Sequence, residues 1–149
     1  MTSINAGSYL LLIELTENHT IQFGKHRRLF GKGYYVYVGS AMRNLRQRIS
    51  RHWMYGEGEY HKHWHVDSIL DSGEVLASVA FPSDVRREEE LSLMVSRFGR
   101  AIPNFGASDC KRTRSNLYSL VDLRDFYSIV RKALEFHWEE NESRCASLS

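Results

Sequence analysis

The fold of this chain is decided by the stretch Gly33-Tyr34-Tyr35-Val36-Tyr37-Val38-Gly39-Ser40-Ala41-Met42-Arg43-Asn44-Leu45-Arg46-Gln47-Arg48-Ile49-Ser50-Arg51-His52. Its first part is rich in tyrosine and valine, which favour strands, and Gly39 ends that strand. Asn44 is suited to the N-cap position of a helix that begins at Leu45. The stretch therefore predicts a strand–turn–helix unit.

Two polar side chains lie on the face of this helix that should meet the rest of the protein. With 3.6 residues per turn, Arg48 and His52 share a face with Leu45 and Ile49. One interpretation is structural: Arg48 extends to a surface carboxylate, and His52 is a hydrogen-bonded histidine at the boundary of the core. The other is that both side chains belong to a functional site. Periodicity by itself favours the structural interpretation, because structural ion pairs are commoner than active sites.

Length and composition indicate one globular domain. The chain has 149 residues, of which 42% are hydrophobic and 12% aromatic. We expect a single domain over residues 1–140, long enough to bury a core, and a flexible C-terminal tail over residues 141–149.

The sequence also predicts where the protein works. It has two cysteines and no charged-then-apolar leader before the first predicted strand, which favours a reduced, cytoplasmic location. No apolar run approaches the ~18 residues of a membrane span. We therefore expect no membrane association.

Further strands and helices are predicted on both sides of the opening stretch. The segment from Ser8 to Leu15 is almost continuously apolar, which is typical of a central strand buried on both faces. The other predicted strands are Thr20 to Phe23, Val75 to Phe81 and Leu117 to Val121, and the other predicted helices are Val85 to Phe98 and Leu123 to Glu139. The economical arrangement is a small, mainly antiparallel sheet whose first three strands are joined by hairpins, flanked by helices, which is an α+β (mixed α/β) fold.

Basic residues cluster although the formal net charge is only +2. The segment from Lys25 to Gly31 reads as a basic loop, and we expect it to form, with Thr20 to Phe23, an extra hairpin arm that can reach nucleic acid. More arginines crowd the helix that begins at Leu45. The predicted nucleic-acid-binding residues are Lys25, Arg27, Arg28, Lys32, Arg43, Arg46 and Arg51.

Histidines gather before another apolar segment with helical spacing. His61 and His65 are four residues apart, as are His63 and Asp67, a spacing that can hold a zinc ion. The alternative is a set of surface histidines. It is favoured because no thiolate lies nearby in the sequence.

Several motifs, taken in order, resemble the GIY-YIG nuclease superfamily. Tyr37-Val38-Gly39 followed by Asn44-Leu45, Arg48 and His52 resembles the second half of its signature, and Gly7-Ser8-Tyr9 resembles the first half. The later segments are similar to an uncharacterised, archaeal-type branch that is sometimes fused to endonuclease III. They are His63-Trp64-His65-Val66-Asp67, Glu88 to Leu91 and Phe105-Gly106-Ala107-Ser108-Asp109-Cys110.

The resemblance implies a metal-dependent DNA endonuclease that acts at branched or damaged sites, with a repair protein as partner. Tyr37 would be the general base and Tyr9 would orient the water or the phosphate. His52 or His65 would assist, and Arg48 would brace the scissile phosphate. Because tyrosine has an ordinary pKa near 10, it is a weak base at neutral pH unless a cation lies close.

One magnesium or manganese ion is expected, because these ions prefer carboxylate and water ligands. The resemblance assigns it to a glutamate on the helix after Pro82, either Glu88 or Glu90. The structural interpretation of these acids is that they complement the helix dipole. Some superfamily members have a lysine where this chain has Ser40. The absence of that cation would either lower the activity or be made good by Lys32 or Arg43.

The contrasting hypothesis is a non-catalytic nucleic-acid-binding module with the same fold. Basic residues and exposed aromatic rings would serve phosphate contact and base stacking equally well. The nuclease interpretation requires Tyr9, Tyr37, Arg48 and a glutamate to share one concave patch.

Overall fold

Two strands of equal length form the centre of the sheet. A computed structural model describes residues 4–57, 65–106 and 115–148. In it, β1 (Gly7–Leu15) pairs antiparallel with β4 (Gly33–Ala41) along the whole length of both strands. β1 is buried on both faces because apolar side chains project from it in both directions, as its continuous apolar sequence predicts.

Three shorter or peripheral strands complete this sheet. β5 (Glu74–Pro82) pairs with the other edge of β1, and β7 (Leu117–Leu120) pairs with β4. β6 (Arg100–Ala101) pairs with β7. The strand order is β5-β1-β4-β7-β6 with every neighbouring pair antiparallel, so the predicted mainly antiparallel α+β fold is confirmed.

The predicted hairpin arm forms a separate two-stranded sheet, β2 (His19–Phe23) and β3 (His26–Phe30). The expectation that it joins the main sheet between its neighbours is wrong, and so is the expectation of a loop from Lys25 to Gly31. Gly24 has φ +57° and allows a two-residue turn between Phe23 and His26. Phe23 and Phe30 are buried against the main core, so the hairpin packs on the sheet.

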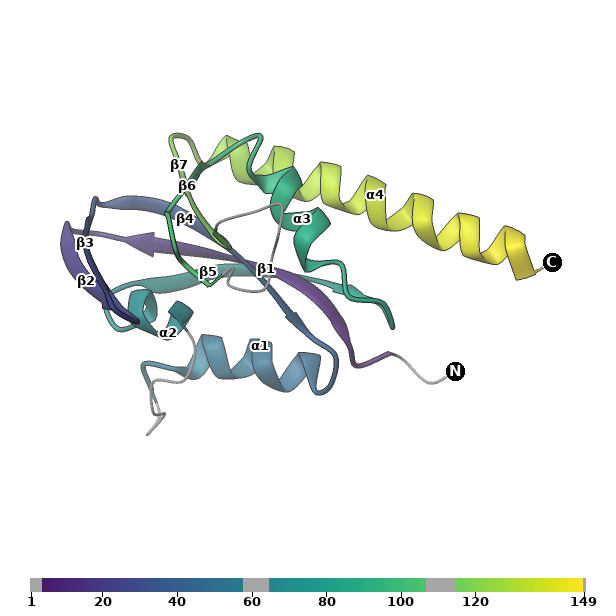
Figure 1. Cartoon of the computed structure of the whole chain (residues 1–149), viewed down its shortest axis with the longest axis horizontal. Helices are drawn as coiled ribbons and strands as arrows, with labels where there is room; N and C mark the ends of the chain where they lie inside the picture. The colour runs from purple at the N-terminus through teal and green to yellow at the C-terminus, as the bar shows by residue number, and fades with distance from the viewer. Residues whose placement is uncertain (1–3, 58–64, 107–114, 149) are drawn as a thin grey trace.

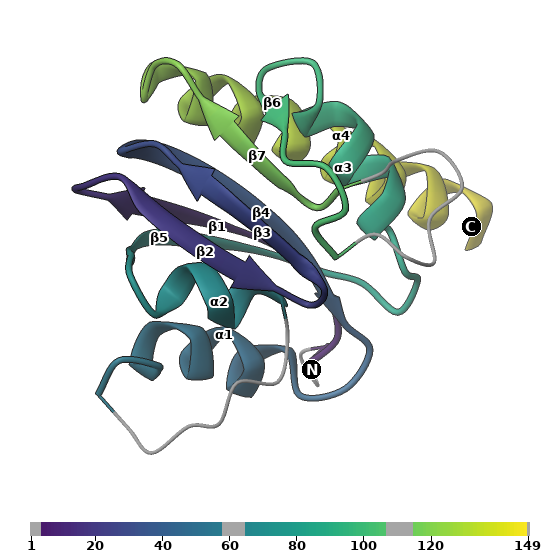
Figure 2. The ribbon, with the colours of Figure 1, turned by 60° about the vertical axis from the view of Figure 1, so that its left-hand side comes forward.

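Helices cover both faces of the sheet (Figure 1). α1 (Leu45–Met54) and α2 (His65–Leu70) lie on the same face as the β2–β3 hairpin, whereas α3 (Glu88–Val95) and α4 (Arg124–Leu148) lie on the other (Figure 2). Alternation along β1 separates two cores. Tyr9 and Leu11 join the α1 and α2 side, and Leu10 and Leu12 join the α3 and α4 side.

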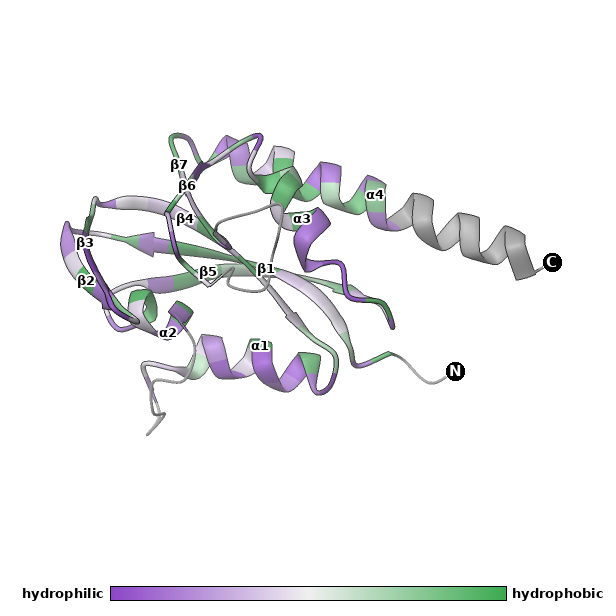
Figure 3. Ribbon diagram, in the orientation of Figure 1, coloured by the Kyte–Doolittle hydropathy of each residue, from purple (hydrophilic) through white to green (hydrophobic). Residues whose placement is uncertain are grey.

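α1 begins where the sequence predicts, but a different residue caps it. Asn44 adopts the left-handed conformation, with φ 57°, and its side chain makes no capping hydrogen bond. The main-chain oxygen of Asn5 accepts from Leu45 N at 3.2 Å, and Asn5 Oδ1 accepts from Arg46 N at 2.9 Å. Two of the helix's first N–H groups are therefore satisfied from the segment that precedes β1. The helix surface is largely hydrophilic (Figure 3).

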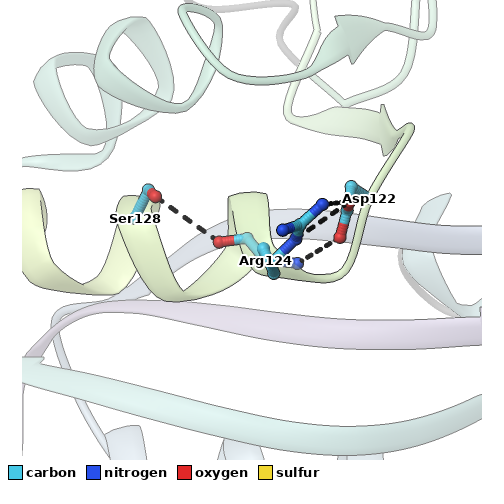
Figure 4. A network of polar contacts seen from close by, with 3 residues as sticks. All are labelled: Asp122, Arg124 and Ser128. Atoms are coloured by element: carbon cyan, nitrogen blue, oxygen red, sulfur yellow. Dashed lines mark hydrogen bonds and ion pairs between the residues drawn. The ribbon is translucent and has the colours of Figure 1, made fainter.

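The other two long helices differ from prediction at their ends. α3 starts at Glu88 rather than Val85, because Ser83 Oγ accepts a hydrogen bond from Val85 N and holds a turn there. Asp122 accepts from Arg124 N at 2.8 Å just before α4, and it also binds the Arg124 guanidinium (Figure 4). α4 continues to Leu148, where we had expected a flexible tail from residue 141. The segment contains neither glycine nor proline, so nothing in it breaks a helix.

Candidate active site

Tyr9 and Tyr37 come together because β1 and β4 pair in register. Tyr9 lies opposite Gly39, and the two tyrosine rings are 6.3 Å apart. A Cβ atom built on Gly39 would lie 2.3 Å from Tyr9 Cζ, so only glycine leaves room for the ring to cross β4 here. Both tyrosines are buried, with 2% and 9% of their surfaces exposed. Their rings are covered rather than lying open in the concave patch that we had expected.

His52 of α1 completes this aromatic group. Its Nε2 atom shares a hydrogen bond of 2.8 Å with the Tyr9 hydroxyl, and its ring lies 6.4 Å from the Tyr37 ring. The structural interpretation of His52 is therefore correct in that the side chain is hydrogen-bonded, although the residue is buried rather than at the boundary of the core. The same bond places a titratable group directly on Tyr9.

Burial dominates the protonation of all three groups. It raises the pKa of Tyr9 and of Tyr37, and for Tyr37 the nearby Glu88 carboxylate raises the pKa further. Arg48 lowers the pKa of both tyrosines, as a base would require, but its effect is outweighed. Burial lowers the pKa of His52 to about 4. At neutral pH the group therefore holds two phenols and an uncharged imidazole.

Ser40 connects charged side chains from both faces of the sheet. Arg48 Nη1 on α1 donates to the Ser40 carbonyl oxygen at 2.5 Å. Ser40 Oγ donates to Glu88 Oε1 on α3 at 3.2 Å, and Arg86 Nε donates to Ser40 Oγ at 3.2 Å. The pairing of β7 with β4 ends at Tyr37, before Ser40 is reached. Arg48 and Glu88 thus both contact Ser40, which lies near the end of β4, the strand that carries Tyr37.

The geometry distinguishes the two candidate metal ligands. Glu88 reaches Ser40, whereas Glu90 Oε1 lies 3.9 Å from Nη1 of Arg87, the residue just before α3. Among the described residues, no group of three or more histidine, cysteine, aspartate or glutamate side chains is placed to hold a metal. A single half-buried carboxylate beside a hydroxyl fits a magnesium or manganese ion that keeps most of its water. It does not fit a zinc ion, which takes several protein ligands.

The structure gives Arg51 a role other than the predicted one in nucleic-acid binding. Its guanidinium forms two bonds to the Asp67 carboxylate, at 3.0 and 3.1 Å. The Asp67 side chain is fully buried, and only 17% of the Arg51 side chain is exposed. The pair joins α1 to α2. The Asp67 charge also acts against the effect of burial on the pKa of His52.

His65 is not brought to the tyrosines. It begins α2 and packs against the rings of Phe23 and Phe105, at 6.1 and 5.8 Å. The Phe105 ring also lies 6.5 Å from the Tyr37 ring, so Phe105 contacts both His65 and Tyr37. His61 and His63, and with them the spacing that can hold a zinc ion, lie outside the described residues, as does Cys110.

The remaining predicted nucleic-acid-binding residues are exposed. Lys32 precedes the far end of β4, where its main-chain nitrogen donates to Asn18 Oδ1, so it does not supply the cation that the sequence predicts beside Ser40. Arg86 contacts the Ser40 side chain instead, and no local pattern in the sequence indicated this contact. The hairpin forms one wall of a 230 Å³ cavity lined by Phe23, His26, Arg27, Arg28, Pro103 and Asn104. Lys25, Arg43 and Arg46 are also exposed.

The fold and the site together define a class: an α+β domain on an antiparallel sheet, with a buried tyrosine–histidine group next to a serine that joins arginine and glutamate. The model of one protein family, described as a domain of unknown function, DUF123, matches residues 8–138, and the chain belongs to this family. Comparison with curated proteins and with solved structures found no match. No helix in the described part of the chain is long and apolar enough to cross a membrane.

Proposed function

We propose that this protein is a divalent-metal-dependent endonuclease that hydrolyses phosphodiester bonds in DNA. The observation that carries the proposal is the meeting of Arg48 and Glu88 at Ser40, beside the strand position of Tyr37. The ordered resemblance to GIY-YIG nucleases supports it. The same resemblance favours branched or damaged DNA as substrate, a repair protein as partner and a cytoplasmic location.

Arg48 and Glu88 supply the two charges that phosphodiester hydrolysis requires. Glu88 would hold the magnesium or manganese ion. When bound, this ion would neutralise the charge that develops on the phosphate during hydrolysis. Arg48 presents a planar set of donors to the non-bridging oxygens. It lies on α1, on the face of the sheet that carries Tyr9 and Tyr37, and its charge lowers the pKa of both tyrosines.

Proton removal from water is best served by Tyr9 and His52 acting together. Because burial keeps both phenols neutral, neither is a ready-made base. Tyr9 can accept a proton from water while it passes its own to His52 Nε2, across the 2.8 Å hydrogen bond. Within the described residues, the Tyr37 hydroxyl makes no such bond. His52 also lines a 480 Å³ cavity through which the proton can reach solvent.

The test incubates purified protein with linear, nicked, flapped and branched DNA, with magnesium or manganese. We expect Arg48→Ala to lower kcat by about 10²–10³, as when one donor to a developing oxyanion is lost. Glu88→Ala should abolish metal-dependent cutting, and Glu90→Ala, on the same helix, is its matched control. Cutting that survives both Arg48→Ala and Glu88→Ala would come from a contaminant and would contradict the proposal.

A nucleic-acid-binding module without catalysis is the second candidate function. It is favoured by the basic hairpin, whose Arg27 and Arg28 are exposed beside a cavity and form no ion pair among the described residues. The raised pKa values of the tyrosines also favour it. DNA binding without cutting of any substrate in the panel would select this candidate.

A further inference from the structure

Arg86 lies at the candidate site but has no part in the function proposed above. It belongs to the segment between β5 and α3, and its side chain is exposed. Its Nε atom donates to Ser40 Oγ at 3.2 Å, which is its only hydrogen bond or ion pair among the described residues. The two terminal nitrogens of the guanidinium therefore keep their donors for another group.

The Ser40 hydroxyl is used in both directions. Its single hydrogen is directed to Glu88 Oε1, so the oxygen accepts from Arg86 Nε. A guanidinium anchored through Nε keeps a defined orientation and loses less conformational freedom when it binds a ligand. Ser40 thus positions Arg86 next to the carboxylate of Glu88.

Arg48 is anchored on the same residue through a different atom. Arg48 Nη1 bonds the Ser40 carbonyl oxygen, while Arg86 bonds the Ser40 hydroxyl. Two guanidinium groups and the Glu88 carboxylate therefore meet at Ser40. Two planar cations that share one anchor suit an oxyanion with several oxygens, and a phosphate group has this form.

We propose that Arg86 binds, together with Arg48, the phosphate group that the site takes from nucleic acid, and that Ser40 Oγ positions it. The inference rests on the proposed function for the identity of the ligand. It gives the site a second cation beside Arg48. The cation comes from a segment more than forty residues away, since Arg86 and Ser40 are separated by 46 positions.

The experiment measures DNA binding without metal, so that it does not depend on cleavage. Fluorescence anisotropy with a labelled branched DNA gives the slope of log K against log salt concentration. Arg86→Ala should reduce the magnitude of this slope by about 0.9, the value for one phosphate contact. Arg97→Ala removes an equally exposed charge from the end of α3 and should leave the slope unchanged.

Two further variants separate the charge from its anchor. Arg86→Lys should restore the slope, since it restores the charge. Ser40→Ala keeps the charge and should weaken binding at every salt concentration, and the double variant Ser40→Ala/Arg86→Ala should bind no more weakly than Arg86→Ala. Equal slopes for Arg86→Ala and Arg97→Ala would overturn the inference. A wild-type protein that binds DNA but never cuts it would overturn the proposed function alone.

Discussion

Gly39 sets the position of Tyr9. A side chain at residue 39 would project into the ring that crosses β4, and Tyr9 has no free space into which it can move, because it is 2% exposed. The second motif of the sequence thus ends in glycine for a steric reason. Because the Tyr9 ring lies over Gly39, the first motif, which contains Tyr9, contacts the second motif, which contains Gly39.

Gly39→Ala should therefore destabilise the fold and misplace Tyr9. The new Cβ would lie 2.3 Å from Tyr9 Cζ and 2.4 Å from the hydroxyl oxygen. Overpacking of this kind costs about 1–3 kcal/mol in unfolding free energy. Urea denaturation measures it. Gly56→Ala is the control, because a Cβ atom there meets no atom within 4 Å. Equal stability of the two variants would mean that the Tyr9 ring can shift.

At the scale of elements, α1 has two separate tasks. One face carries Arg48 and His52 toward the sheet. Arg51 joins the helix to α2 through Asp67. The sequence makes every arginine on this helix a candidate for binding nucleic acid. Arg51 is structural instead, because its partner Asp67 is buried.

Arg51→Ala should lower stability far more than it lowers DNA affinity. It leaves the Asp67 carboxylate buried without its cation, and breaking such a pair costs about 3–5 kcal/mol. Arg46→Ala removes an exposed arginine from the same helix and is the control. Unfolding in urea and DNA binding are measured for both variants. If Arg51→Ala left stability unchanged and weakened binding, the ion pair would not be the role of Arg51.

At the scale of the whole molecule, the sheet separates two surfaces. The basic hairpin and α1 lie on one face, and α3 and α4 lie on the other (Figure 2). Ser40 lies where side chains from both faces meet. This arrangement places the exposed hairpin arginines on the same side of the sheet as Arg48.

The stability of the whole fold should depend on pH through His52. Its pKa is about 4 in the folded protein and near 6.5 in an unfolded chain. Between these values the unfolded state binds more protons, so the unfolding free energy falls as the pH falls from about 6.5 to 4. The full loss is about 3 kcal/mol. Urea denaturation across this range measures it, and His52→Gln should remove most of the slope. An unchanged slope in His52→Gln would assign the effect to other groups.

Local sequence patterns identified most of the elements and part of the site. Apolar runs and strand-forming residues indicated β1, β4, β5 and β7, and periodicity placed α1 with Arg48 and His52 on its inner face. These signals are local, because strand propensity and helical period act over a few residues. The turn at Gly24 was not predicted because the basic residues after it were read as a loop. The pairing of β1 with β4 was not predicted because it depends on how the hairpin packs.

The sequence by itself determined the mainly antiparallel α+β fold and the inner face of α1, which carries Arg48 and His52. Only the tertiary structure decided which glutamate reaches Ser40, that Arg86 joins it, and that Arg51 is held by Asp67. The reason is physical. A contact between residues far apart in the chain depends on strand register and on loop paths, and no local period or propensity encodes either.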